Sequence, residues 1–192
     1  EFGGGVSDGV NGITAYKGKY NELQANKAYF FFDNMMFCIG SDISYVQNDN
    51  VLTSVEQNLL NGEVIYNDGQ EKQLSNSNMQ LKQLKWVYHN NTGYIFRGTD
   101  NVTIQNMPQA GSWKDINATG ESGLIDKNVF SVWINHGLNP ENASYQYIVV
   151  PDKSIDAFRD LAEQIDLYIA QNDGSVQAIR EGNKYGLVFY KS

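Results

Sequence analysis

Short runs of apolar, aromatic and β-branched residues, separated by turn residues, set the strongest constraint on the fold of this chain. Residues 27–33 and 36–41 stand on either side of a short turn, and residues 130–137 lead through Pro140 to residues 145–151. Runs of this kind, bounded by Gly, Asn, Asp and Pro, are typical of strands buried in a sandwich. The sequence therefore predicts an all-β fold, a large antiparallel β-sandwich.

The same pattern predicts about a dozen strands along the chain. They are residues 13–16, 28–32, 36–39, 51–59, 63–66, 80–89, 94–96, 102–105, 129–135, 145–150, 176–180 and 187–190. Residues 67–80, rich in Asn, Ser and Gln, are predicted to form a long hairpin connection. This short spacing of strands is expected of a sandwich or barrel.

One segment has helical rather than alternating spacing. Apolar residues recur at Ile155, Phe158, Leu161, Ile165 and Ile169, with Ser154 placed as the N-cap. The spacing predicts one amphipathic helix over residues 154–171, ended by an Asn-Asp-Gly sequence and covering an edge or face of the sandwich.

Length and composition favour a single globular domain over residues 1–192, with 41% hydrophobic and 12% aromatic residues. We expect no membrane segment, since no apolar run reaches the roughly 18 residues that a span requires. The net charge of −8 and the absence of a Lys/Arg stripe argue against a nucleic-acid partner. The one cysteine, Cys38, lies in an apolar strand and is predicted to be a buried hydrophobe.

Five motifs in order resemble polysaccharide lyase family 8, whose members include chondroitin, hyaluronate and xanthan lyases. They are the Phe-Gly-Gly-Gly-Val-Ser-Asp-Gly sequence of residues 2–9, the aromatic hairpin of residues 29–41, the W-x-x-H-x-x-x-G-Y-x-F sequence of residues 86–96, and residues 111–117 and 133–151. The resemblance is to the central β-sandwich of that family, a supersandwich similar to galactose mutarotase, and it covers nearly the whole chain.

The resemblance implies that the chain is part of a larger bacterial lyase, secreted because its polymers are too large to enter a cell. The parent would cleave acidic, uronic-acid-containing polysaccharides by β-elimination, without cofactor or metal, and we expect it to be a monomer. The family places its catalytic groups on a helical toroid, and none of those groups has a matching position here. We therefore expect no catalytic residue in this chain, no activity from it alone, and a role as one wall of the substrate cleft that braces the toroid.

The chain has two histidines, His89 and His136, and both lie in or at the end of predicted strands. We predict structural histidines with satisfied hydrogen bonds rather than catalytic ones. Tyr88 and His89 are adjacent strand residues that point to opposite faces, so they are poorly placed to act on one substrate atom. Their spacing also does not match a protein metal site.

The connection of residues 57–62 is the best candidate for substrate contact, through Asn58 and Asn61. The resemblance implies that this connection faces the cleft, and Leu59 stands where chondroitin AC relatives carry a tryptophan able to stack on a sugar. Trp113 is a further candidate for stacking, against the alternative that it packs under a loop. Trp86 and Trp133 lie within strand patterns and are predicted to be core residues.

Two other functions remain open at this point. A free-standing, non-catalytic sugar-binding or adhesion module could use the same sandwich and would bind a neutral glycan through Trp113 or Asn58. A mutarotase-like or hydrolytic enzyme would require convergent histidine and carboxylate groups, which the sequence does not place together.

Overall fold

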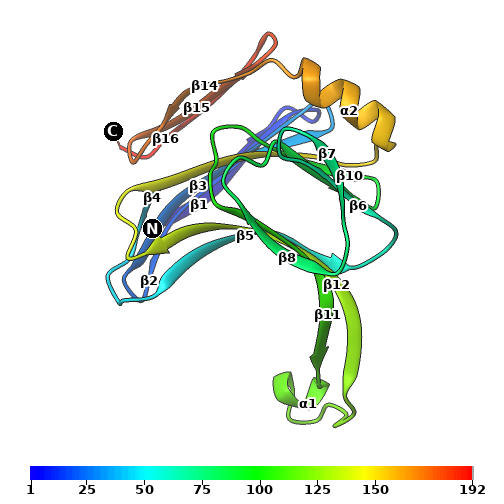
Figure 1. Ribbon diagram of the computed structural model, residues 1–192. Coiled ribbons are helices and arrows are strands. Elements are labelled where there is room, and N and C mark those ends of the chain that lie inside the picture. The colour runs from blue at the N-terminus through cyan, green and yellow to red at the C-terminus, as the bar shows by residue number, and fades with distance from the viewer. Residues whose placement is uncertain (192) are drawn as a thin grey trace.

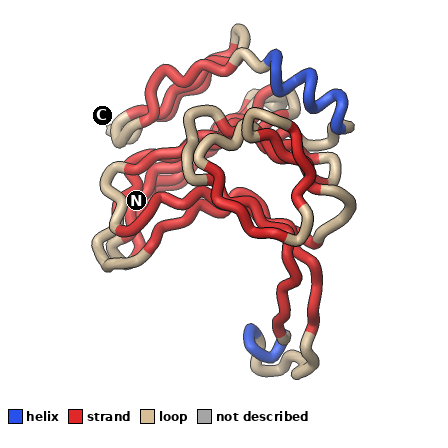
Figure 2. Tube along the Cα trace, in the orientation of Figure 1, coloured by secondary structure: helices blue, strands red, loops and turns tan. Residues whose placement is uncertain are grey.

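The computed structural model describes residues 1–191, which form three antiparallel sheets and two helices (Figure 1). A nine-stranded sheet lies in the middle. A four-stranded sheet packs on one of its faces, and a three-stranded sheet with one helix packs on the other (Figures 1 and 2). The prediction of an all-β sandwich is confirmed.

The bounds and the order of the elements are as follows. The nine-stranded sheet runs in the order β1 (Phe2–Ser7), β2 (Gly12–Tyr20), β3 (Leu23–Phe32), β4 (Met35–Ser44), β13 (Ala143–Val150), β10 (Thr92–Phe96), β9 (Trp86–His89), β6 (Val64–Asn67) and β7 (Glu71–Leu74). The four-stranded sheet runs β5 (Asn50–Leu59), β12 (Ile125–Leu138), β11 (Val102–Gly111) and β8 (Ser77–Leu81). The three-stranded sheet runs β14 (Leu167–Asn172), β15 (Val176–Glu181) and β16 (Lys184–Phe189), and the helices are α1 (Trp113–Ile116) and α2 (Ile155–Gln164).

Two-residue turns fix the register of the hairpins that carry the strongest sequence motifs. Asp33 and Asn34 join β3 to β4, and Asn90 and Asn91 join β9 to β10, all four with positive φ angles between 48° and 60°. Two successive left-handed residues make a type I′ turn, which Asn and Asp adopt more readily than other non-glycine residues. These turns therefore decide which side chains of each strand face which layer.

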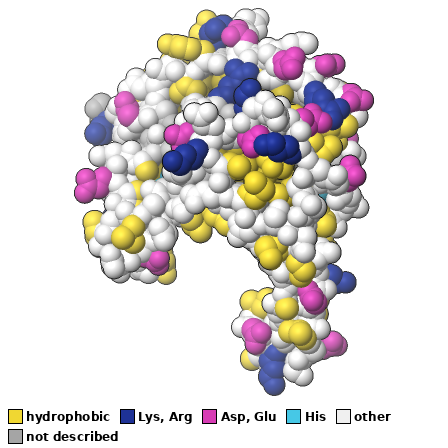
Figure 3. All heavy atoms as spheres, viewed as in Figure 1, with side chains coloured by type: hydrophobic (Ala, Val, Ile, Leu, Met, Phe, Trp, Pro, Cys, Tyr) yellow, Lys and Arg dark blue, Asp and Glu magenta, His cyan; other side chains and the backbone are white. Residues whose placement is uncertain are grey.

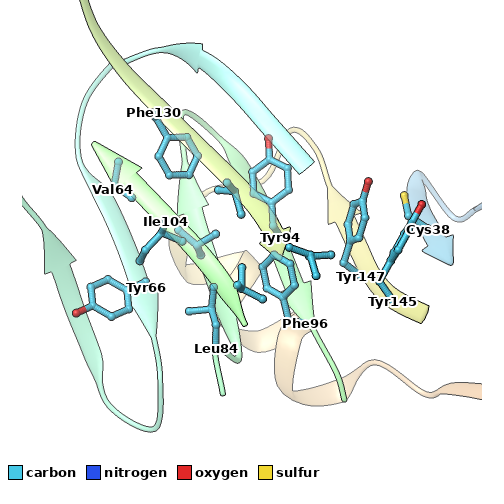
Figure 4. Packing of buried hydrophobic residues seen from close by; sticks show 14 of the residues in the cluster. Cys38, Val64, Tyr66, Leu84, Tyr94, Phe96, Ile104, Phe130, Tyr145 and Tyr147 are labelled. Atoms are coloured by element: carbon cyan, nitrogen blue, oxygen red, sulfur yellow. The ribbon is translucent and has the colours of Figure 1, made fainter. Parts of the chain in front are cut away.

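The core is divided into two apolar layers by the nine-stranded sheet. Between that sheet and the four-stranded sheet, Phe130 and Ile104 pack against Val64, Tyr94 and their neighbours (Figure 4). Cys38 is fully buried in this layer, as predicted, and burial raises the pKa of its thiol to about 12.

The second layer lies beneath α2 and the three-stranded sheet. Phe158 of α2 is fully buried, with its ring centroid 5.4 Å from that of Trp86 and 5.5 Å from that of Tyr88. Gly93 makes this contact possible, because a Cβ at that position would lie 2.0 Å from the Phe158 ring. Trp86 is a core residue, as predicted.

The predicted helix over residues 154–171 is correct only in its first part. Ser154 caps α2 as expected, but the helix ends at Gln164, and Leu167–Asn172 is strand β14. Leu167 and Ile169 are half-buried while Tyr168 is exposed, so the apolar residues alternate there with a period of two. Ile165, Tyr168 and Ile169 fit helical spacing by coincidence, and pairing with β15 decides the outcome.

Several other boundaries differ from the prediction. Residues 80–89 are not one strand, since β8 ends at Leu81 and β9 begins at Trp86 in a different sheet. The predicted connection of residues 67–80 contains β7 and most of β8, and the short helix α1 was not predicted. Trp133 is only half-buried, because Val132 and Ile134 occupy the core-facing positions of β12 and leave Trp133 on the outer face.

No helix within residues 1–191 is both long enough and apolar enough to cross a bilayer.

Candidate functional site

Asn58 and Asn61 lie at the end of the sandwich where β5 of the four-stranded sheet passes into β6 of the nine-stranded sheet. Asn58 is on the strand rather than in the connection, directly opposite Phe130 of β12. Its Oδ1 accepts a hydrogen bond of 2.8 Å from the backbone N–H of Leu59. This bond leaves the two N–H groups of the exposed Asn58 side chain available as donors.

Asn61 lies in the connection itself and is held by the β9–β10 hairpin. Its backbone N–H donates to Nε2 of His89 at 3.0 Å, and its side-chain Nδ2 donates to Oδ1 of Asn90 at 2.9 Å. These bonds do not use Oδ1 of Asn61, an acceptor on an exposed residue. Asn58 and Asn61 thus present a free donor and a free acceptor, the pair that sugar hydroxyls require.

His89 is the buried support of this connection. It is 3% exposed, and its ring centroid lies 4.7 Å from that of Phe130. Burial lowers the pKa of His89, and the charge of Glu56 offsets this only in part. The prediction of a satisfied structural histidine is confirmed, and Tyr88 points to the opposite layer as expected.

Glu56 and Tyr94 form a second support that the sequence analysis missed. The Tyr94 hydroxyl donates to Oε2 of Glu56, and burial together with this bond raises the pKa of Tyr94. Alternation from the buried Val51 and Thr53 would place Glu56 on the outer face. A bulge between the pairings of Val132 and Trp133 instead turns Glu56 inward, and no pattern in the sequence signals this bulge.

A shallow hollow of about 370 Å³ lies beside the connection. Leu60, Gly62 and the carboxylate Glu63 line it from the connection. The amides of Asn76, Asn106 and Asn128 line it from the strands and turn opposite. Amide side chains donate and accept hydrogen bonds without carrying charge. The surface next to Asn58 and Asn61 is therefore suited to hydroxyl groups.

Trp113 lies far from both asparagines, at the tip of the long β11–β12 hairpin that stands out from the body of the molecule (Figures 1 and 3). Along β12, the positions paired with Asn58 and Gly111 are separated by roughly 17 Å. Trp113 is 58% exposed rather than packed beneath a loop. It lines a hollow of about 300 Å³ with Ile116 and Ile125.

The second histidine, His136, lies outside the candidate site. Nε2 of His136 lies 2.8 Å from Oγ1 of Thr53, and burial lowers the pKa of His136. Within residues 1–191, no group of three His, Cys, Asp or Glu side chains is placed to hold a metal ion. The arrangement at Asn58 and Asn61 offers hydrogen bonds to a ligand but no acid–base pair.

Comparisons with known proteins show the family to which this fold belongs. The family model described as "Polysaccharide lyase family 8, super-sandwich domain" matches residues 1–162. Chondroitinase-AC of Pedobacter heparinus is 40% identical over 151 residues, which cover 79% of this chain and 22% of that protein. Xanthan lyase of Bacillus sp. is 29% identical over 191 residues, which cover 90% of this chain and 20% of that protein.

Solved structures give the same result. A structure of chondroitinase AC lyase in complexes with oligosaccharides superimposes with a TM-score of 0.89 at 34% identity, covering 98% of this chain and 28% of that one. Xanthan lyase of Paenibacillus also gives a TM-score of 0.89, at 28% identity, with coverage of 98% and 20%. The chain thus spans between a fifth and a third of the length of these relatives. The match over most of its length shows that this chain belongs to polysaccharide lyase family 8, as a super-sandwich domain.

Proposed function

We propose that the chain is the central domain of a larger secreted bacterial lyase that cleaves uronic-acid-containing polysaccharides by β-elimination. In this reaction a base removes the proton at C5 of the uronate, the C4–O bond breaks to leave a C4=C5 double bond, and the departing oxygen takes up a proton. The chain supplies none of these groups in our proposal. They belong to the helical toroid of the parent, the domain that the sandwich braces, and the parent acts as a monomer.

The contribution of this chain is one wall of the substrate cleft. The observation that carries this role is the free donor of Asn58 beside the free acceptor of Asn61, both exposed on a connection that His89 holds in place. A polysaccharide presents hydroxyl groups at regular intervals, and hydrogen bonds to fixed amides set the register of such a ligand. The net charge of −8 means that attraction of a polyanion must come from elsewhere in the parent.

The test compares the purified chain with the full-length product of its gene. Each is incubated with chondroitin, hyaluronan and xanthan while the ultraviolet absorbance of the unsaturated uronate is followed. We expect absorbance to rise with the full-length protein alone, on at least one polymer. Turnover by the chain itself would place catalytic groups within it and would refute the division of labour.

One observation favours a second candidate, a non-catalytic sugar-binding module. The exposed Trp113 forms an apolar tip with Ile116 and Ile125, and exposed indole rings can stack on sugar faces. Binding of a neutral glycan by the chain, lost on Trp113→Ala, would support this function. Lack of lyase activity in the full-length protein would be needed as well.

A further inference from the structure

The position of Asn61 depends on one hydrogen bond to a buried ring. Nε2 of His89 accepts the Asn61 backbone N–H at 3.0 Å, so the proton of the neutral imidazole is on Nδ1. His89 is the last residue of β9 and leads directly into the type I′ turn, whose first residue, Asn90, holds the Asn61 side chain. Both bonds come from the same hairpin, and the hairpin therefore sets both the backbone and the side chain of Asn61.

Protonation of His89 would turn the acceptor in this hydrogen bond into a donor. An imidazolium ring donates from both nitrogens, so its Nε2–H would point at the Asn61 N–H instead of accepting it. The backbone of residue 61 would then have to move or lose its partner. His89 itself cannot contact a ligand, because it is 3% exposed and lies against Phe130.

We propose that neutral His89 is a positioning residue that fixes Asn61 at the substrate-facing end of the sandwich, and that protonation of His89 releases this connection. The inference rests on the substrate role proposed above for Asn61. It goes beyond that role because it identifies what holds the contact in place and a condition that removes it.

The surroundings of His89 favour the neutral form. Burial is the larger influence and lowers the pKa of His89, while the nearby Glu56 on β5 raises it. Tyr94 on β10 donates its hydroxyl to Glu56 and stays protonated, since its pKa is raised. The residues that pair or pack with His89 from β6 and β12, Val64 and Phe130, do not titrate.

The first experiment is a pH titration of the ¹⁵N-labelled 192-residue chain followed by NMR. We expect the Asn61 amide signal to move with the same midpoint as the His89 ring signals, below the ordinary histidine pKa of 6.5. The amide of Gly137, next to His136, reports on the second histidine, and the Asn61 amide should follow the His89 ring signals rather than those of His136. An Asn61 amide that stays unchanged while His89 titrates would overturn the inference.

Three variants of the full-length protein separate the hydrogen bond from simple packing. His89→Phe keeps a ring against Phe130 but removes the acceptor, whereas His89→Gln keeps an acceptor that does not titrate. His136→Phe is the matched control, since His136 bonds to Thr53 and not to the connection. We expect His89→Phe to raise KM for the polysaccharide about three- to tenfold while kcat stays within about twofold of wild type. For His89→Gln and His136→Phe, both KM and kcat should stay within about twofold of wild type.

The two measurements keep the inference distinct from the proposed function. His89→Gln should also remove the part of the pH dependence of KM that has the His89 midpoint, which a packing role would not do. Equal losses in His89→Gln and His89→Phe would overturn the positioning role. If His89→Phe shifts the NMR signal of the Asn61 amide but leaves KM unchanged, the positioning role of His89 stands. The contact between Asn61 and substrate is then refuted.

Discussion

Two regions along strand β12 differ in how their exposed side chains are supported. Near Phe130, the β5–β6 connection is held by His89 and by the Glu56–Tyr94 bond, both within the core between the sheets. Toward the Ile125 end of β12, the β11–β12 hairpin leaves the body of the molecule (Figure 3). Trp113 at its tip is 58% exposed.

This difference separates two ways in which a sandwich can present groups to a polysaccharide. A supported connection holds hydrogen-bonding groups in a defined geometry, and its function is linked to the stability of the core beneath it. An extended hairpin offers an apolar surface whose substitution leaves the core unchanged. Substitutions that weaken the support of the β5–β6 connection should therefore change stability and activity together. Substitutions at the tip of the β11–β12 hairpin should leave stability unchanged.

The largest effect is expected from removing the ring beneath the connection. Phe130 is fully buried and contacts His89, so Phe130→Ala should lower the free energy of unfolding by about 3–5 kcal/mol. Urea denaturation of the chain measures this loss. A loss below about 1 kcal/mol would mean that the supported end is no better packed than the hairpin.

A smaller loss is expected from the Glu56–Tyr94 bond. Tyr94→Phe removes the donor to a carboxylate and should cost about 1.5 kcal/mol, the low end for bonds to charged groups, because Glu56 is only half-buried. Tyr66→Phe is the control, since the equally buried Tyr66 donates only to the sulfur of Met79 at 3.7 Å. Equal losses in the two variants would show that the Glu56 bond adds no stability.

The pH dependence of stability should also reflect the buried histidines. The pKa values of His89 and His136 are lowered mainly by burial, so the unfolded chain binds more protons than the folded one below about pH 6.5. The histidine contribution to the free energy of unfolding should be fully present above that pH and should decline as the pH falls below it. Denaturation curves about one unit either side of 6.5 test this, and His89→Gln should flatten the decline.

The smallest effect is expected at the hairpin tip. Trp113→Ala removes an exposed ring and should change the free energy of unfolding by no more than about 0.5 kcal/mol. Urea denaturation beside Phe130→Ala gives the contrast directly. A loss above about 1 kcal/mol would show that the tip packs on the body in solution.

The sequence predicted the layers of the fold better than their edges. Asp33-Asn34 and Asn90-Asn91 specify hairpins through local turn chemistry. The first hairpin was predicted correctly, whereas the strand predicted before the second, residues 80–89, begins in fact at Trp86. Strand β14 was missed because a few apolar residues fit both a helical and an alternating period. Pairing with β15, the next strand along the chain, settles this segment, and the Asp173-Gly174 turn between the two strands is the local signal for that hairpin.

The sequence suggested Asn58 and Asn61 as candidate residues, but it indicated only part of what holds them in place. The prediction that Asn58 and Asn61 contact substrate came from the family resemblance and stays a prediction. The role of His89 as a satisfied structural residue followed from its place in an apolar strand. The inward turn of Glu56 depends on a bulge in the pairing with β12, and the separation of Trp113 from the asparagines depends on how far that hairpin extends.

The most direct test of the central claim compares kcat/KM for two variants of the full-length protein. The double variant Asn58→Ala/Asn61→Ala removes the two side chains proposed to hydrogen-bond the polysaccharide and should lower kcat/KM about tenfold or more. Trp113→Ala should leave kcat/KM within about twofold of wild type. The opposite result, a loss at Trp113 with the asparagine variant unchanged, would contradict the account and place substrate at the hairpin tip.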